Sequence, residues 1–78
     1  MTLDDRLRRT FAVGLNIPED SDFESLAYRG IEEWDSVAHM MLVSEIESEF
    51  GVMLDTEDVL AMSSFPIARE TVLRLQDG

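Results

Sequence analysis

The chain has 78 residues, a hydrophobic fraction of 45% and no cysteine. One small domain of this length buries only a modest core, and without cysteine it has neither disulfides nor thiolate metal sites. Seventeen acidic residues face six arginines, for a formal net charge of −11. This charge argues against nucleic acid and anionic membranes as partners, because both repel such a surface.

The first predicted element is a helix from about Leu3 to Val13. Thr2 and Asp5 have the spacing of a capping box at its start, and Gly14 is a typical helix terminator. The apolar residues of this segment fall on one helical stripe: Leu3, Leu7 and Phe11. We therefore expect an amphipathic helix that packs this stripe against the rest of the domain.

Residues 15–35 lack helical periodicity and contain Pro18, Gly30 and an acidic run. Apolar residues recur through the segment, so we expect an ordered loop, with one helical turn, that packs onto the bundle. The acidic run imitates the start of a calcium loop. However, Ser25 stands where that loop needs glycine and Ile31 where it needs a bidentate glutamate. No metal site is predicted.

The second helix is predicted from Ser36 to Phe50, with Asp35 or Ser36 as its N-cap and Gly51 as its terminator. One arc of this helix should face the core: His39, Leu42, Val43, Ile46 and Phe50. The opposite side carries Val37, Met41, Ser44 and Ser48, with Met40 and Glu47 at its edge. Apolar residues gathered on the outer side of a helix are typical of a contact surface.

A short third helix is predicted from Thr56 to about Met62, with Thr56 as its cap. The last helix should begin near Phe65, with Ser64 as its cap and Pro66 in its first turn, where proline is tolerated. No strand alternation is visible. The predicted fold is all-α: a small four-helix bundle of three longer helices and one short helix, with a long first loop, in a single domain over residues 1–78.

The sequence offers no constellation for catalysis. His39 is its only histidine and is predicted to point inward, and no phosphate-binding glycine loop or zinc motif is present. We therefore predict that the protein is not an enzyme. Ser36 stands at a helix start, where an attached phosphate would be stabilised. The residues alone leave open a simpler alternative, in which this serine is only a helix cap.

Part of the sequence resembles a known family. Leu26, Tyr28, Ile31 and residues 34–40, which read Trp-Asp-Ser-Val-Ala-His-Met, are similar to the Asp-Ser-Leu modification motif of acyl and peptidyl carrier proteins. The sub-group that reads Trp-Asp-Ser-Leu-x-His is the nearer match. Residues 45–51 resemble the acidic second helix of that family, which ends in Phe-Gly, and residues 56–75 resemble its short third helix and its fourth helix. The likeness is specific from Leu26 to Gly51, and Val37 replaces the usual leucine.

The resemblance implies a stand-alone carrier with 4'-phosphopantetheine attached covalently to Ser36. A phosphopantetheinyl transferase would attach this arm, and Asp35 would help to present the serine. The arm would hold an acyl or aminoacyl group as a thioester. The group would come from a loading enzyme and pass to a downstream synthase or transferase. The apolar outer side of the second helix favours a dedicated polyketide, nonribosomal peptide or related pathway.

From residue 30 to residue 68 there is no arginine or lysine, but there are nine acids. A basic partner surface is the natural complement of such a field. The predicted partner-binding residues are Val37, Met40, Met41, Glu45, Glu47, Asp55, Glu57 and Asp58. We expect a cytoplasmic monomer. The alternative is an unmodified acidic adaptor of the same fold that docks on a basic enzyme surface.

Overall fold

The computed structural model describes residues 2–77, so Met1 and Gly78, which belong to the predicted domain, lie outside the described residues. The elements in chain order are α1 (Leu3–Leu15), a 3-10 turn η1 (Phe23–Ser25), α2 (Ser36–Phe50), α3 (Thr56–Ala61) and α4 (Phe65–Asp77). No strand occurs within the described part of the chain, where Ala27 and Ser64 form one isolated bridge. The predicted all-α fold of three longer helices and one short helix is confirmed.

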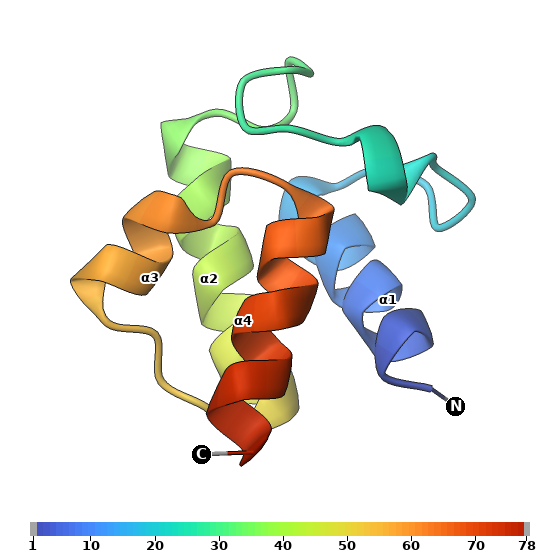
Figure 1. Cartoon of the computed structure of the whole chain (residues 1–78). Coiled ribbons are helices and arrows are strands. Elements are labelled where there is room, and N and C mark those ends of the chain that lie inside the picture. The colour runs from blue at the N-terminus through green and yellow to red at the C-terminus, as the bar shows by residue number, and fades with distance from the viewer. Residues whose placement is uncertain (1, 78) are drawn as a thin grey trace.

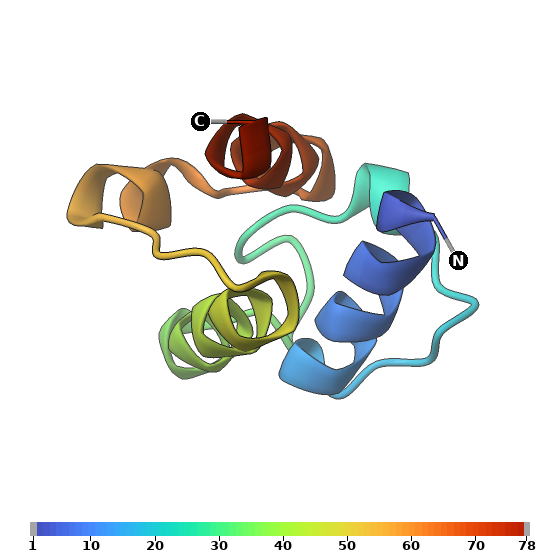
Figure 2. The ribbon, with the colours of Figure 1, turned by 90° about the horizontal axis from the view of Figure 1, so that it is seen from below.

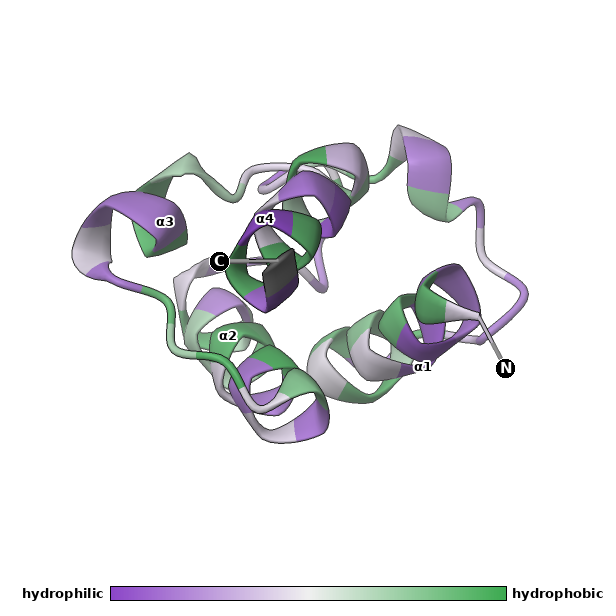
Figure 3. Cartoon of the chain, turned by 60° about the horizontal axis from the view of Figure 1, so that its bottom comes forward, coloured by the Kyte–Doolittle hydropathy of each residue, from purple (hydrophilic) through white to green (hydrophobic). Residues whose placement is uncertain are grey.

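The loop between α1 and α2 crosses the end of the bundle where α2 begins (Figure 1). The connection from α3 to α4 reaches the same end. Seen from below, α1, α2 and α4 surround the interior, and α3 lies outside them (Figure 2). Each helix carries both hydrophobic and hydrophilic residues (Figure 3), as expected where one side of a helix is buried and the other is in water.

The core is built largely from aromatic and branched side chains. Phe11 lies at its centre, with ring centroids 5.5 Å from Trp34 and 5.0 Å from Phe65. The largest fully buried side chains come from all three long helices, from the loop and from the residue after α3: Trp34, Phe11, Phe65, Leu7, Leu42, Ile46, Met62 and Val72. Because Trp34 belongs to the first loop, that loop is part of the core.

The start of α1 agrees with the sequence, but its end does not. Thr2 accepts the backbone N–H of Asp5 at 3.1 Å, and the capping box is complete. The helix then continues through Gly14 to Leu15, and Asn16 ends it in the left-handed conformation with φ 57°. Gly14 serves packing instead, because a Cβ added there would lie 2.9 Å from the Cα of Leu42. The prediction of Gly14 as terminator was therefore wrong.

The first loop is ordered, as predicted, and contains the single turn η1. Phe23 and Leu26 are buried. The backbone N–H of Tyr28 donates to the carbonyl of Ser63 at 2.8 Å, which ties the loop to the connection between α3 and α4. The loop is thus fixed at both the core and the end of the bundle.

The bounds of α2 are those predicted, and Gly51 ends the helix with φ 64°. The cap of α3 was wrong by one residue. Asp55, not Thr56, is the N-cap, and its Oδ1 accepts the N–H of Asp58 at 2.8 Å. At the start of α4 the hydroxyl of Ser64 accepts the N–H of Ile67 at 3.3 Å, as its predicted cap role requires.

Candidate functional site

The sequence left open whether Asp35 or Ser36 is the N-cap of α2, and the structure decides between them. Asp35 is the N-cap, and its Oδ1 accepts the backbone N–H of Ala38 at 2.8 Å. Ser36 is the first residue of the helix, and its side chain is exposed. Because a carboxylate already satisfies the helix start, the hydroxyl of Ser36 has no capping role.

Two side chains from the first loop converge on that hydroxyl. The phenol oxygen of Tyr28 lies 2.9 Å from Ser36 Oγ, and Nη2 of Arg29 donates to the same oxygen at 3.4 Å. The hydrogen bond with the Ser36 hydroxyl, followed by that with Arg29, lowers the pKa of Tyr28 below its ordinary value. An exposed hydroxyl, a phenol and a guanidinium therefore share one small region of the surface.

The loop backbone places these two side chains beside α2. The N–H of Arg29 donates to the carbonyl of Trp34 at 3.0 Å, and the N–H of Gly30 donates to that of Ala27 at 2.8 Å. Arg29 has a left-handed backbone with φ 63°, a conformation that side-chain-bearing residues seldom adopt. The hydrogen-bonded turn over residues 27–34 thus places Arg29 beside Ser36.

Trp34 and His39 anchor this turn to the bundle. The indole N–H of Trp34, which is fully buried, donates to Nδ1 of His39 at 3.0 Å. Since that nitrogen accepts, the imidazole hydrogen is on Nε2, which lies 2.8 Å from the carbonyl of Val59 and donates to it. His39 therefore links the loop, α2 and α3 as a hydrogen-bonded structural residue, in agreement with its predicted inward position.

The outer side of α2 carries an apolar face, which we define as Val37, Met40 and Met41. Val37 is 71% exposed and both methionines are 59% exposed. These residues directly follow Ser36 in the helix. Leu60 on α3 and Met53 before it are also largely exposed, and the sequence did not point to either. The pattern of apolar residues in the sequence gave no sign that these two side chains are exposed.

The acids predicted to bind partners divide into two groups. The side chains of Glu45 and Glu57 are exposed and form no hydrogen bond or ion pair with other described side chains or backbone groups. The others act within the fold. Glu47 accepts the N–H of Leu54 at 2.9 Å, while Asp55 caps α3 and Asp58 pairs with Arg74.

Most arginines are held by acids of the same chain. Arg6 pairs with Glu49 at 2.9 Å, and Arg69 pairs with Asp4 at 2.9 Å and also with Glu24. Arg9 lies 3.6 Å from Glu19. Among residues 2–77, Arg8 and Arg29 form no ion pair. Arg29 is therefore a cation beside Ser36 that no acid of the described chain holds in an ion pair.

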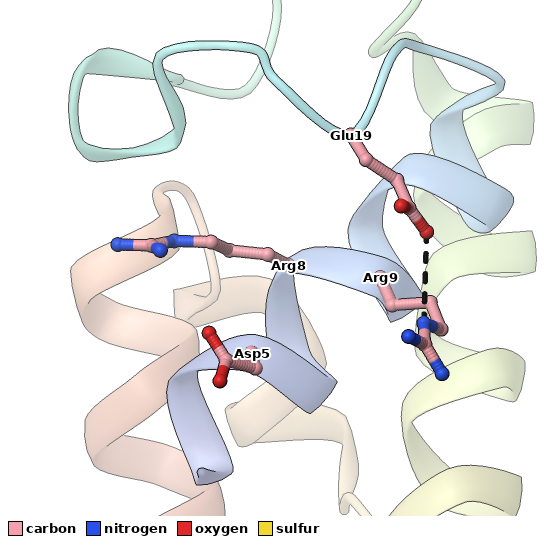
Figure 4. A pocket seen from close by; sticks show the side chains of 4 residues that line it. All are labelled: Asp5, Arg8, Arg9 and Glu19. Carbon is pink, nitrogen blue, oxygen red and sulfur yellow. Dashed lines mark ion pairs between the residues drawn. The ribbon is translucent and has the colours of Figure 1, made fainter. Parts of the chain in front are cut away.

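A surface hollow elsewhere lies between α1 and the first loop. Its lining residues are Asp5, Arg8, Arg9 and Glu19, and the last two form the ion pair marked in Figure 4. A second, shallow hollow adjoins the site and is lined by Arg29, Ile31, Glu32, Trp34 and Asp35. Across residues 2–77 we find no group of three or more His, Asp or Glu side chains placed to hold a metal ion.

Within the described part of the chain, every helix is too short or too polar to cross a membrane. No protein-family model matches the chain, and no curated protein is similar enough to count as a match. The function must therefore be argued from the site itself.

Proposed function

We propose that the protein is a carrier that bears a phosphopantetheine arm on Ser36 and passes a tethered acyl or aminoacyl group between enzymes. One observation carries the proposal: Asp35 caps α2, so the exposed hydroxyl of Ser36 is not used as the helix cap. The simpler reading of Ser36 as a helix cap therefore loses its main support. The resemblance of residues 34–40 to the carrier modification motif points to the same hydroxyl.

The donors around Ser36 fit the phosphodiester that would join the arm to the protein. A phosphodiester needs an exposed attachment oxygen and donors for its charged oxygens. Ser36 offers the first, and Arg29 and Tyr28 lie within hydrogen-bond distance of its Oγ. Both hydrogen bonds of Ser36 Oγ are exposed, so attachment at this position would not disturb a buried network.

In the proposed attachment of the arm, the chain itself supplies only the nucleophilic oxygen, Ser36 Oγ. In the transfer, Ser36 Oγ attacks the phosphorus next to pantetheine in coenzyme A. The Oγ–P bond forms, the bond to the bridging pyrophosphate oxygen breaks, adenosine bisphosphate leaves, and the hydroxyl proton goes to a base of the transferase. When bound, the arm supplies a thiol that holds the cargo as a thioester. The protein is then a substrate for other enzymes, not a catalyst.

The surface next to Ser36 suits brief encounters with several enzymes. The apolar face of α2 offers adaptable contacts, because methionine packs against varied surfaces. Exposed acids such as Glu45 and Glu57 would steer it toward basic patches, which raises association rates more than affinity. A dedicated biosynthetic pathway in the cytoplasm, with the carrier as a monomer, completes the proposal. The partners are a phosphopantetheinyl transferase, a loading enzyme and a downstream synthase or transferase.

Intact-protein mass spectrometry tests the proposal directly. The protein is incubated with coenzyme A, magnesium and a broad-specificity phosphopantetheinyl transferase, with Ser36→Ala in parallel. We expect wild type to gain the mass of one phosphopantetheinyl group and the variant to gain nothing. Ser48→Ala, which changes an exposed serine of the same helix, is the matched control and should be loaded like wild type.

A folded wild-type protein that resists two different transferases would overturn the proposal. The adaptor alternative would then be the better account. It would also predict that Ser36→Ala keeps full activity in whatever assembly the protein serves, since docking does not require that hydroxyl.

A further inference from the structure

Arg29 lies in a long stretch of the chain that has no other basic residue. It is the single arginine or lysine between residues 10 and 68. Among the side chains that the structure describes it forms no ion pair, although the charge of Asp35 acts on it. Its guanidinium instead reaches Ser36 Oγ at 3.4 Å. A cation in so acidic a chain would normally be neutralised by one of its own carboxylates, as four other arginines are.

Tyr28 is fixed independently of Arg29. Its backbone donates to Ser63, its ring lies 6.3 Å from that of Trp34, and its phenol oxygen is 2.9 Å from Ser36 Oγ. The two side chains therefore reach the same oxygen from adjacent positions of one turn. The guanidinium carbon lies 5.7 Å from the centre of the Tyr28 ring.

We propose that Arg29 and Tyr28 form a binding site for the phosphodiester of the arm, which holds the base of the arm against the turn over residues 27–34. This inference rests on the proposed function and adds a residue-level account of how the arm is held. Before loading, the same two side chains hold the hydroxyl that is to be modified. After loading, they bind the charged oxygens attached to it.

Attachment of the arm changes which oxygens can accept hydrogen bonds from Arg29 and Tyr28. Ester formation removes the hydroxyl hydrogen of Ser36 and leaves Oγ as a poor acceptor, while the two non-bridging oxygens share a full negative charge. Those oxygens lie two bonds beyond Ser36 Oγ, the atom that both side chains already reach. The carboxylates of Glu32 and Asp35, which line the same hollow as Arg29, would repel the new charge. Arg29 is the cation that offsets this repulsion.

The first test compares thermal stability before and after loading. Wild type, Arg29→Gln, Arg29→Lys and the control Arg8→Gln are each loaded, and the mass confirms attachment. Arg8→Gln removes the same charge from another arginine without an ion pair in the described chain. We expect the loaded-minus-unloaded Tm to fall by about 2–4 °C in Arg29→Gln relative to wild type and Arg8→Gln. Arg29→Lys should keep part of the difference, and high salt should reduce it.

The second test uses the ultraviolet absorbance of Tyr28, the only tyrosine of the chain. The Ser36 hydroxyl, and after it Arg29, lower the pKa of this phenol in the unloaded protein. Ser36→Ala removes the hydroxyl donor alone, and loading removes it and adds an anion that accepts from the phenol. We therefore expect the pKa of Tyr28 to rise in Ser36→Ala and to rise further in the loaded protein.

The outcomes separate the two proposals. Loading that succeeds with equal Tm differences in Arg29→Gln and Arg8→Gln, and with a Tyr28 titration like that of Ser36→Ala, would overturn the phosphodiester site and leave the carrier function standing. Failure of wild type to load would overturn both. Two results together would establish the site. The loaded-minus-unloaded Tm must be lower in Arg29→Gln than in Arg8→Gln, and the pKa of Tyr28 must be higher in the loaded protein than in Ser36→Ala.

Discussion

Replacing Asp35 should cost the protein more stability than replacing Ser36, although the serine is the residue that resembles a modification site. Asp35→Ala removes the 2.8 Å hydrogen bond to the N–H of Ala38 and a negative charge from the start of α2. Loss of an N-cap costs about 1 kcal/mol, and loss of the charge adds about 0.5 kcal/mol. For a 78-residue domain, this lowers Tm by roughly 6–12 °C.

Ser36→Ala should change the free energy of unfolding by less than about 0.5 kcal/mol, because its exposed hydroxyl caps nothing. Asp35→Asn keeps a capping oxygen and should fall between the other two variants. Urea denaturation followed by circular dichroism gives the three values on one scale. If Ser36→Ala proves as destabilising as Asp35→Ala, then the serine has a structural role and the reasoning behind the carrier site is refuted.

Three further predictions follow from the packing and the surface. Gly14→Ala should destabilise by about 1–3 kcal/mol in urea denaturation, because the added methyl meets the Leu42 backbone at 2.9 Å; a more stable variant would contradict this packing. His39→Phe should cost about 2 kcal/mol by the same measurement, since the buried indole N–H loses its acceptor, and a neutral result would show that water replaces it. Met40→Gln combined with Met41→Gln should leave Tm unchanged but lower kcat/KM of the transferase by about tenfold; unchanged kinetics would exclude the apolar face from recognition.

The sequence predicted well wherever the decisive signal was local. Both ends of α2 were correct because a capping residue precedes the helix and Gly51 follows it. The fold class followed from helical periodicity and the absence of strand alternation. Gly14 shows the limit of local signals, since a glycine near a helix end indicates either a terminator or a close approach of two helices. The contact with Leu42, which decides between them, is made by a residue far along the chain.

The candidate site was predictable only in part for the same reason. Ser36 and Asp35 could be found because they are adjacent in a known type of motif. Arg29 could not be found, because its position beside Ser36 depends on the turn that its own backbone closes with Trp34. The internal roles of Glu47 and Asp58 depend likewise on partners elsewhere in the fold. Composition showed that the surface is acidic, but only the structure separates acids used by the fold from those free to meet a partner.

Four consecutive residues at the start of α2, residues 34–37, have four different environments. Trp34 is fully buried and fixes the turn, while Asp35 faces the helix backbone and caps it. Ser36 faces solvent beside Arg29, and Val37 begins the apolar face. Exchanging Trp34 with Asp35 would bury a carboxylate and remove the cap of the helix. In the proposed carrier, the hydrogen bonds that tie this turn to the bundle would favour repeated recognition of Ser36, because the partner enzymes would not first have to order the site.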